Sequence, residues 1–313
     1  MPEITALDGA ILVDKPTGWT SHDVVAKIRH ILGGIKVGHA GTLDPAATGV
    51  LPVLIGKGTR IVQYLVEWDK EYRAVLRLGE TADTQDATGK VLARQPTEGV
   101  TAGAIHEAVA RFRGTVEQVP PMYSAVKVGG VPLYKSARAG KTVTRQARTV
   151  VIQELDVTAI DGRDVTLRIA CSKGTYVRTL CADIGNVLGV GGHLLTLERC
   201  RVGPLSLDQS RTVDEIAMRQ AIGRLEEDVI PLDRALQQLP AVTVDQPTAD
   251  RVRHGASVPL SSVRWTERGD DRMGKSGMPV RIHDATGRLL AIGTYPKEPG
   301  ARLAIEKVLT SQE

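Results

Sequence analysis

Aromatic side chains are scarce in this chain of 313 residues: they make up 3% of it, and Phe112 is the single phenylalanine. A site that stacks a flat ligand must therefore use one of six tyrosines or three tryptophans. Hydrophobic residues still amount to 42%, an ordinary share for a globular protein, so Val, Leu, Ile and Ala must build the core. The length fits one large domain, or a large domain with a small one.

Cysteine is also rare, and Cys171, Cys181 and Cys200 are widely spaced. This spacing excludes a paired-cysteine metal motif and argues against a disulfide framework, which favours the reducing cytoplasm. No apolar run approaches the ~20 residues that a membrane-spanning helix needs. Residues 1–19 lack the basic and apolar segments of a signal peptide. We therefore expect a cytoplasmic protein without membrane contact.

Several common catalytic motifs are missing. The histidines lack metal-ligand spacing, and neither Gly-x-Ser-x-Gly nor a strand followed by Gly-x-Gly-x-x-Gly occurs. Residues 269–276 match the P-loop pattern, but no hydrophobic strand precedes them and no helix start follows. Asp270 and Asp271 would also repel phosphates. We therefore expect neither a metal nor a nucleotide cofactor.

Positive charge is concentrated in residues 124–150, which carry six basic residues and no acidic one. The whole chain has a net charge of +4, so the remainder is net negative. Such a cluster is typical of a phosphate-binding surface, and the alternative is a solvated, mobile segment. Interspersed Gly, Tyr and Val favour an ordered surface loop. The six residues are Lys127, Lys135, Arg138, Lys141, Arg145 and Arg148.

Hydrophobic periodicity predicts both strands and helices between residues 1 and 240. Strands are predicted at 10–13, 70–78 and 165–171. Helices are predicted at 21–32 with Ser21 as N-cap, at 59–65 with Thr59 as cap, at 105–112, just after Gly174, and after a capping box of Thr212 and Glu215. Residues 37–58, rich in Gly and Pro, are predicted to be mostly loop. Because no regular strand–helix–strand repeat occurs, we expect an α/β fold of the α+β type with a mixed, largely antiparallel sheet.

The composition changes near Pro240, and residues 241–313 are predicted to form a small, β-rich domain. A short helix at 248–254 precedes a β-hairpin formed by 280–283 and 289–295, with one more strand near Ala304. Residues 261–277 are polar and are predicted to be mobile.

The densest group of chemically interesting residues lies at 38–49, around Asp44. Pro45 favours an extended conformation of Asp44, and Gly41 and Gly49 let the backbone turn and approach a ligand. The pattern thus presents a carboxylate from a shaped loop. An Asp that makes only local turn hydrogen bonds is the alternative.

A second group lies where the strand ending at Cys171 leads into the next helix. Arg178 could hold a carboxylate with two hydrogen bonds, and Tyr176 could stack on a base. The alternatives are an exposed Arg178 and a core Tyr176. Tyr72 shares a strand face with apolar residues, so a buried tyrosine is its default interpretation.

Five stretches in this order closely resemble the bacterial TruB family of tRNA pseudouridine-55 synthases: residues 14–21, 38–49, 70–73, 83–89 and 174–178. The resemblance covers about residues 1–210. It implies a pseudouridine-synthase fold with a central cleft, a monomer without an obligatory protein partner, no cofactor, and the T-stem-loop of tRNA as substrate.

The resemblance also implies roles for individual residues. Asp44 would be the catalytic aspartate, paired with Arg178, and Tyr72 would pack against the flipped uracil and take the proton from C5. Tyr176, His39 and Leu197 would line the nucleotide site, and Lys15 would support the catalytic loop. The basic segment would grip RNA, and the C-terminal region resembles a PUA-type RNA-binding domain.

The pattern leaves other points open. Asp44 could attack C1′, attack C6, or remove the C2′ proton. A tRNA-binding or tRNA-folding protein with secondary catalysis is an alternative function, and a nucleotide-driven RNA factor using the Lys275 loop is a weaker one.

Overall fold

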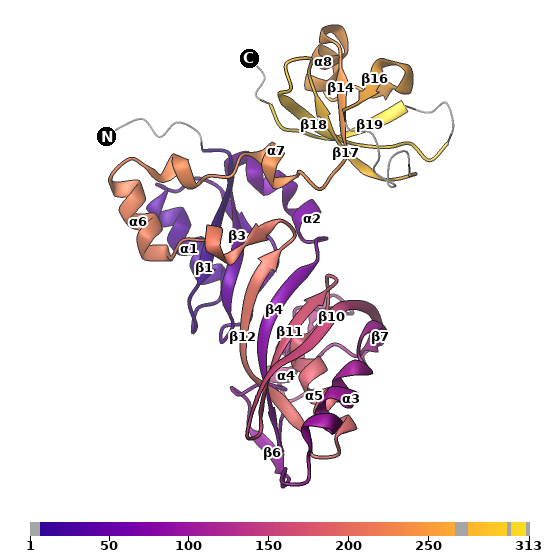
Figure 1. The fold of residues 1–313 in the computed structure, drawn as a ribbon. Helices are drawn as coiled ribbons and strands as arrows, with labels where there is room; N and C mark the ends of the chain where they lie inside the picture. Colours follow the sequence, from indigo (N-terminus) through magenta and orange to yellow (C-terminus); the bar gives the residue numbers. More distant parts are fainter. Residues whose placement is uncertain (1–6, 267–274, 299–301, 311–313) are drawn as a thin grey trace.

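A computed structural model describes residues 7–266, 275–298 and 302–310 of the chain. Figure 1 shows an elongated unit with a smaller C-terminal unit at one end. The strands of the large unit are β1 (Gly9–Lys15), β2 (Val37–His39), β3 (Thr48–Ile55), β4 (Lys70–Leu78), β5 (Glu80–Ala82), β6 (Val91–Arg94), β7 (Gly114–Gln118), β8 (Lys127–Val128), β9 (Val131–Pro132), β10 (Arg148–Asp161), β11 (Asp164–Cys171), β12 (Gly192–Val202) and β13 (Leu205–Ser206). Its α-helices are α1 (Ser21–Ile31), α2 (Val62–Leu65), α3 (Ala102–Ala110), α4 (Leu133–Arg138), α5 (Val177–Val187), α6 (Val213–Ala221) and α7 (Leu232–Ala235).

The large unit is built on a mixed sheet with the strand order β1-β3-β12-β4-β11-β10-β7. Neighbouring strands in this order are antiparallel, except that β12 runs parallel to β3 at their short contact. The long strands β4 and β12 run through the middle of the unit and connect its two halves (Figure 1). The prediction of a mixed, largely antiparallel sheet is therefore confirmed.

Helices cover this sheet and form separate hydrophobic cores along it. Helices α3 and α5 pack on β4, β10 and β11, while α1 and α6 pack on β1 and β3. The predicted capping box of Thr212 and Glu215 begins α6, as expected. The N-cap of α1, in contrast, is Thr20 rather than Ser21, because Thr20 and Asp23 form a capping box there.

The prediction that residues 37–58 are mostly loop is wrong. They contain β2 and all of β3, which is apolar and buried from Gly49 to Ile55. A strand covered on both faces shows no alternation, and Pro52 further hides it. Thr59 also caps no helix, since it lies within the 3₁₀ helix Gly56–Ile61 that leads into α2.

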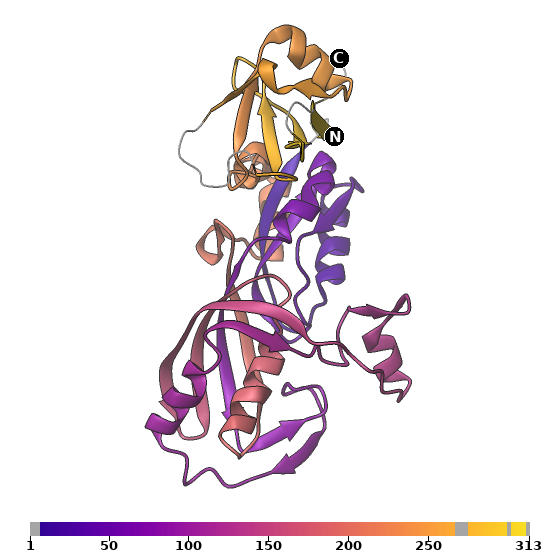
Figure 2. The same ribbon diagram turned by 90° about the vertical axis from the view of Figure 1, so that its right-hand side faces the viewer.

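The basic segment projects from the large unit as a separate arm, which Figure 2 shows on one side of the molecule. We define the basic arm as residues 124–147. It contains the two-stranded hairpin of β8 and β9, followed by α4. Arg148 lies outside it as the first residue of β10. The arm is ordered, as the interspersed Gly, Tyr and Val suggested.

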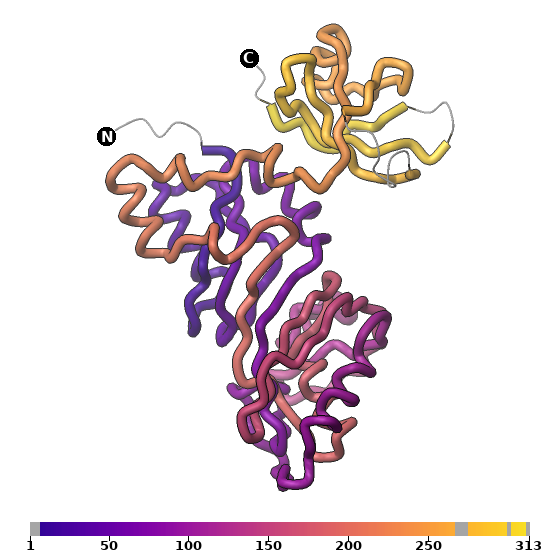
Figure 3. Tube along the Cα trace, viewed as in Figure 1, coloured from indigo at the N-terminus to yellow at the C-terminus, as the bar shows by residue number. Residues whose placement is uncertain are grey.

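The C-terminal unit has its own core and a sheet with the strand order β15-β19-β18-β17-β14-β16. Figure 3 traces the path of the chain through it. The predicted hairpin is confirmed as β17 and β18, and β16 occupies part of the polar stretch 261–277. Residues 267–274, and so most of the P-loop match, lie outside the described residues. The elements are β14 (Ala241–Val244), α8 (Gln246–Arg253), β15 (Val258–Pro259), β16 (Val263–Trp265), β17 (Pro279–His283), β18 (Leu289–Thr294) and β19 (Arg302–Val308).

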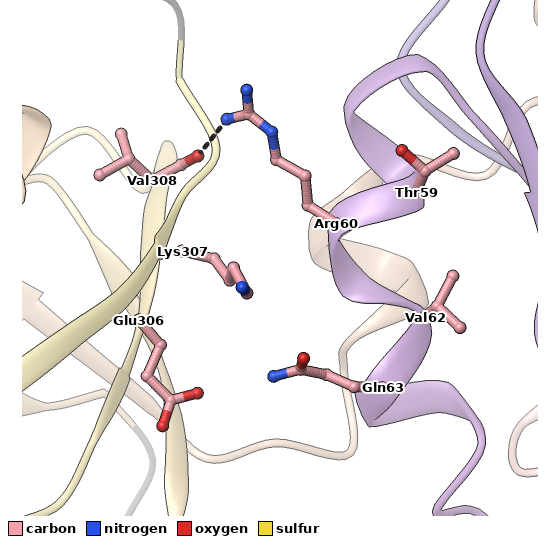
Figure 4. A pocket seen from close by; sticks show the side chains of 7 residues that line it. All are labelled: Thr59, Arg60, Val62, Gln63, Glu306, Lys307 and Val308. Atoms are coloured by element: carbon pink, nitrogen blue, oxygen red, sulfur yellow. Dashed lines mark hydrogen bonds between the residues drawn. The ribbon is translucent and has the colours of Figure 1, made fainter. Parts of the chain in front are cut away.

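Polar and apolar contacts join the two units: Ile292 and Leu309 belong to a hydrophobic cluster of the large unit, and a hollow lies beside this junction. Arg60 donates a hydrogen bond of 2.9 Å to the carbonyl oxygen of Val308 (Figure 4). The Tyr64 hydroxyl donates one of 2.8 Å to Glu306. On α7, Asp233 accepts hydrogen bonds from Arg281 and His283 of β17. The hollow has a volume of about 580 Å³ and is lined by Thr59, Arg60, Val62, Gln63 and residues 306–308. None of the candidate site residues lies there. Within the described residues, no helix has the length and apolar character to span a bilayer.

Candidate active site

Asp44 lies in the loop between β2 and β3, as the glycine pattern predicts. Gly41 and Gly49 flank this loop with φ angles of +92° and +97°, which side chains other than glycine rarely adopt. The Asp44 side chain is 41% exposed at the opening of the loop. Burial by the surrounding protein nevertheless raises the pKa of its carboxyl group, while Arg178 opposes this change.

Arg178 is the counter-charge of Asp44, although 134 positions separate the two residues in the chain. It lies in the first turn of α5 with its side chain 5% exposed. Its Nε is 2.9 Å from one Asp44 oxygen, and its Nη2 donates a hydrogen bond of 3.3 Å to the other. Two such contacts fix the orientation of a carboxylate as well as its charge. The structure therefore brings together the pair that the sequence placed in two separate groups.

The same guanidinium connects three segments. It donates hydrogen bonds to the carbonyl oxygens of Thr84, at 3.2 Å, and Tyr123, at 2.8 Å. A second carboxylate, that of Asp86, lies 3.7 Å from its Nη1 and raises the pKa of Asp44. Asp86 is in turn held by hydrogen bonds from Thr88 and the Thr84 hydroxyl. Arg178 thus faces two carboxylates, and Tyr123 directly precedes the basic arm.

Lys15 supports the Asp44 loop from the end of β1. Its ammonium group is fully buried and donates hydrogen bonds to the carbonyl oxygens of Pro16, Trp19 and Pro45, at 2.8, 2.7 and 3.2 Å. The contact with Pro45 attaches it directly to the residue after Asp44. Burial lowers the pKa of Lys15 to about 8, and the charge of Asp44 acts in the opposite direction. Lys15 is therefore placed to stabilise the loop.

Two tyrosines lie near the ion pair. Tyr72 is on β4 and packs against the core that Ala74 and Leu76 help to form, as predicted. Burial raises its pKa to about 12, so its phenol is protonated at neutral pH. Tyr176 precedes α5, and its pKa is also raised by burial. The negative charge of Asp44 raises both pKa values further, because both phenols lie within its electrostatic reach.

Leu197 and His39 occupy different surroundings. Leu197 of β12 lines a small pocket together with Asp44 and Asp86. This pocket has a volume of only about 20 Å³, about enough for one water molecule. A ligand the size of a nucleobase does not fit into this volume. His39 of β2 instead packs edge-on against His22, with ring centres 5.4 Å apart, and burial lowers its pKa to about 4, so it is neutral.

The six predicted basic residues are not equivalent. Lys127, Lys135, Arg138 and Lys141 are exposed on the basic arm, and the Arg138 guanidinium lies 5.6 Å from the centre of the Tyr134 ring. Arg145 is only half-exposed and donates a hydrogen bond to the carbonyl oxygen of Pro120. Among the residues that the structure describes, none of the six forms an ion pair. Their charges are therefore available to an anionic partner.

Sequence reasoning missed three residues that contact the site. Asp86 gave a possible signal, because it lies in the stretch 83–89 that resembles the family. Gln118 at the end of β7 exchanges two hydrogen bonds with the backbone of Tyr176, at 2.9 and 3.1 Å, and Arg199 of β12 is buried beside Tyr72. Gln118 and Arg199 gave no signal, since both are usually exposed residue types.

Comparison with known proteins agrees with this geometry. The family model "TruB family pseudouridylate synthase (N terminal domain)" matches residues 29–177, and "tRNA pseudouridylate synthase B C-terminal domain" matches residues 178–239. The tRNA pseudouridine synthase B of Thermobifida fusca is 44% identical over 91% of this chain and 94% of its own length. That of Burkholderia lata is 45% identical over 91% of this chain and 86% of its own.

Solved structures share the fold over almost the whole chain. A chain from a Cbf5-Nop10-Gar1 complex has a TM-score of 0.78 and 32% identity, covering 98% of this chain and 87% of that one. A chain from an H/ACA RNP bound to a substrate RNA containing 2′-deoxyuridine has a TM-score of 0.75 and 30% identity, with coverages of 98% and 86%. The fold is therefore that of pseudouridine synthases, and the chain belongs to the TruB family of pseudouridylate synthases.

Proposed function

We propose that this enzyme, a tRNA pseudouridine synthase, converts the uridine at position 55 in the T-loop of tRNA to pseudouridine, with Asp44 as its essential carboxylate. The observation that supports this most directly is the two-contact ion pair between Asp44 and Arg178 in a glycine-flanked loop. The tRNA pseudouridine synthase names of its relatives support the substrate class.

The reaction breaks the C1′–N1 bond, turns the uracil and joins C1′ to C5, so it gains no atoms and loses no electrons. It requires a carboxylate near the ribose and C6 as nucleophile or base. Arg178 favours the ionised form of Asp44 against the effect of burial and cannot itself take up a proton. We propose that the Tyr72 phenol, which packs against the uracil, takes part in moving the proton from C5 to nitrogen.

The target uridine must leave its stack before Asp44 can reach it. Extrusion of a base costs a few kcal/mol, and stacking on an aromatic ring returns roughly 1–3 kcal/mol. Tyr72 and Tyr176 are the aromatic rings beside the ion pair. Phosphate contacts from the basic arm would offset the remaining cost, including the movement that opens the small pocket at Leu197.

We further propose that the chain divides near residue 240 into a catalytic domain and a PUA-like domain, and that the protein acts as a monomer without a guide RNA or protein partner. The separate core of the C-terminal unit supports the division. The exposed charges of the basic arm support direct binding of tRNA.

The decisive experiment incubates the purified protein alone with an unmodified tRNA transcript and maps pseudouridine at single-nucleotide resolution. We expect a single modified position, uridine 55, and no product on a transcript in which the T-loop uridine is replaced by cytidine. Product that appears only after a second RNA or protein is added would contradict the proposal of independent action. Modification at another position would contradict the assigned site.

The proposed role of the basic arm leads to a prediction about the salt dependence of tRNA binding. Replacing Lys127, Lys135, Arg138 and Lys141 by glutamine should weaken tRNA binding and flatten the plot of log affinity against log salt concentration by roughly 3 units of slope, since each phosphate contact contributes nearly one. Filter-binding titrations from low to moderate salt measure this slope. Four exposed basic residues outside the arm, Lys27, Lys36, Arg111 and Arg234, replaced together, provide the control of equal charge. Equal slopes for the two variants would contradict the role of the arm.

A further inference from the structure

Arg199 is among the largest fully buried side chains of the protein, with an exposure of 1%. It lies on β12, and its guanidinium donates hydrogen bonds to the carbonyl oxygens of Val50, at 2.7 Å, and Gly41, at 3.0 Å. Among the described residues no carboxylate pairs with it. Removing a guanidinium from water costs several kcal/mol, and two carbonyl oxygens return only part of that. An apolar side chain would fill this place at a lower cost, so a role other than stability is indicated.

The arginine lies between the two parts of the active site. In the antiparallel pairing of β12 and β4, Arg199 is directly opposite Tyr72, so both side chains are on the same face. The guanidinium lies close enough to the Tyr72 phenol for the two groups to interact electrostatically. Burial raises the pKa of Tyr72, and the nearby positive charge of Arg199 opposes that increase. The position of the guanidinium opposite Tyr72 is therefore suited to orienting the phenol.

Both glycines that flank the Asp44 loop are in contact with the same residue. A Cβ atom added to Gly41 would lie 3.4 Å from Nη1 of Arg199. One added to Gly49 would lie 2.3 Å from the backbone oxygen of Arg199, which no structure tolerates without movement. The loop that presents Asp44 thus packs closely on the residue that faces Tyr72.

We propose that Arg199 is a positioning residue for the isomerisation: anchored by the Gly41 and Val50 carbonyls, it fixes the Tyr72 hydroxyl relative to the Asp44 loop. This inference rests on the proposed function of Asp44 and Tyr72. It adds a buried cation that acts on the reaction through the tyrosine.

The test compares Arg199→Lys and Arg199→Gln in two backgrounds, the natural chain and Tyr72→Phe. In the natural background we expect Arg199→Gln to lower single-turnover kcat about 30- to 100-fold while KM for tRNA changes less than about threefold, because the phenol is misplaced but RNA contacts remain. Arg199→Lys keeps the charge, so its kcat should regain, on a logarithmic scale, at least about a third of the fall seen with Arg199→Gln. In the Tyr72→Phe background, Arg199→Gln should lower kcat by less than about threefold, since the effects of residues that act as a unit are not additive.

Arg201 provides the matched control, because it lies on the same strand but its side chain is 38% exposed and pairs with Glu71. Arg201→Gln should leave kcat within about twofold in both backgrounds. Equal losses from Arg199→Gln with and without the Tyr72 hydroxyl would overturn the proposal and assign Arg199 a purely structural role. A loss confined to KM would overturn it as well.

A separate measurement covers the case in which the Arg199 variants do not fold. Tyr72→Phe alone should lower Tm by about 2–6 °C, because it leaves an N–H group of a buried guanidinium without its partner. An unchanged Tm would show that the side chains of Arg199 and Tyr72 do not interact and would contradict the proposal. The Tm measurement does not depend on enzymatic activity, so it tests the inference about Arg199 by itself. A failure of the proposed function would instead appear as an absence of pseudouridine with the natural enzyme.

Discussion

Asp44→Asn should abolish pseudouridine formation, with a fall in single-turnover rate of at least about 10⁴-fold. The amide keeps the size and shape of the carboxylate but can neither attack carbon nor accept a proton. Binding of tRNA should stay within about threefold, because the proposed phosphate contacts come from the basic arm and not from the loop. Rapid-quench assays give the rate, and filter binding gives the affinity.

Two further variants make this result interpretable. Asp44→Ala excludes slow deamidation of asparagine back to aspartate as a source of residual product. Asp161→Asn removes an exposed carboxylate from the end of β10 and should leave the rate unchanged. A near-normal rate for Asp44→Asn would contradict the proposed role of Asp44. Normal tRNA annealing by the same inactive variant would support a second, non-catalytic function in tRNA folding.

Elements with a clear period could be predicted from the sequence. Strand β4 alternates over nine residues, with Ala74, Leu76 and Leu78 buried on one face, and the structure has the strand at the predicted residues. The capping box before α6 and the hairpin of β17 and β18 were likewise visible, because both depend on local residue chemistry. Local patterns of this kind require no knowledge of the tertiary fold.

Elements whose pattern depends on tertiary contacts could not be found. Strand β3 is buried on both faces, so its sequence shows an apolar run with a proline instead of alternation. In β10, shifts in register at Ile152/Glu154 and Val157/Ala159 break the alternation of buried residues. A sequence pattern without alternation does not predict a strand at these residues. Its pairing with β7 and β11 only becomes evident once the sheet is formed.

The same distinction applies to the site. Asp44 and Arg178 stood out because glycine, proline and the strand-to-helix passage shape their surroundings, and the family resemblance paired them. The depth of Arg199 and the proximity of Asp86 to Arg178 depend on how β12 and residues 83–89 fold around the loop. Arginine and aspartate are usually exposed, so the sequence alone favoured the wrong environment for both residues.

Arg178→Met should cause the second largest fall in rate, and the pH dependence of kcat in this variant identifies the cause. Without the guanidinium, Asp44 and Asp86 lose the positive charge that lies beside both of them and only the weaker effect of Lys15 opposes burial, so the pKa of Asp44 rises further above its ordinary value. In the proposed mechanism the ionised form is the active one. The acid limb of the plot of kcat against pH should therefore move to higher pH, with activity recovering partly as the pH is raised.

The expected loss for Arg178→Met is about 10³-fold at neutral pH, and about 10²-fold for Arg178→Lys, which keeps a charge but not the two-contact geometry. The free energy of unfolding should fall by about 2–3 kcal/mol, less than for a fully buried pair because Asp44 is 41% exposed. Arg163→Met, which breaks the remote pair of Arg163 with Glu80, is the control and should leave the pH profile unchanged. A rate loss for Arg178→Met without a shift of the acid limb would mean that Arg178 orients Asp44 but does not set its charge.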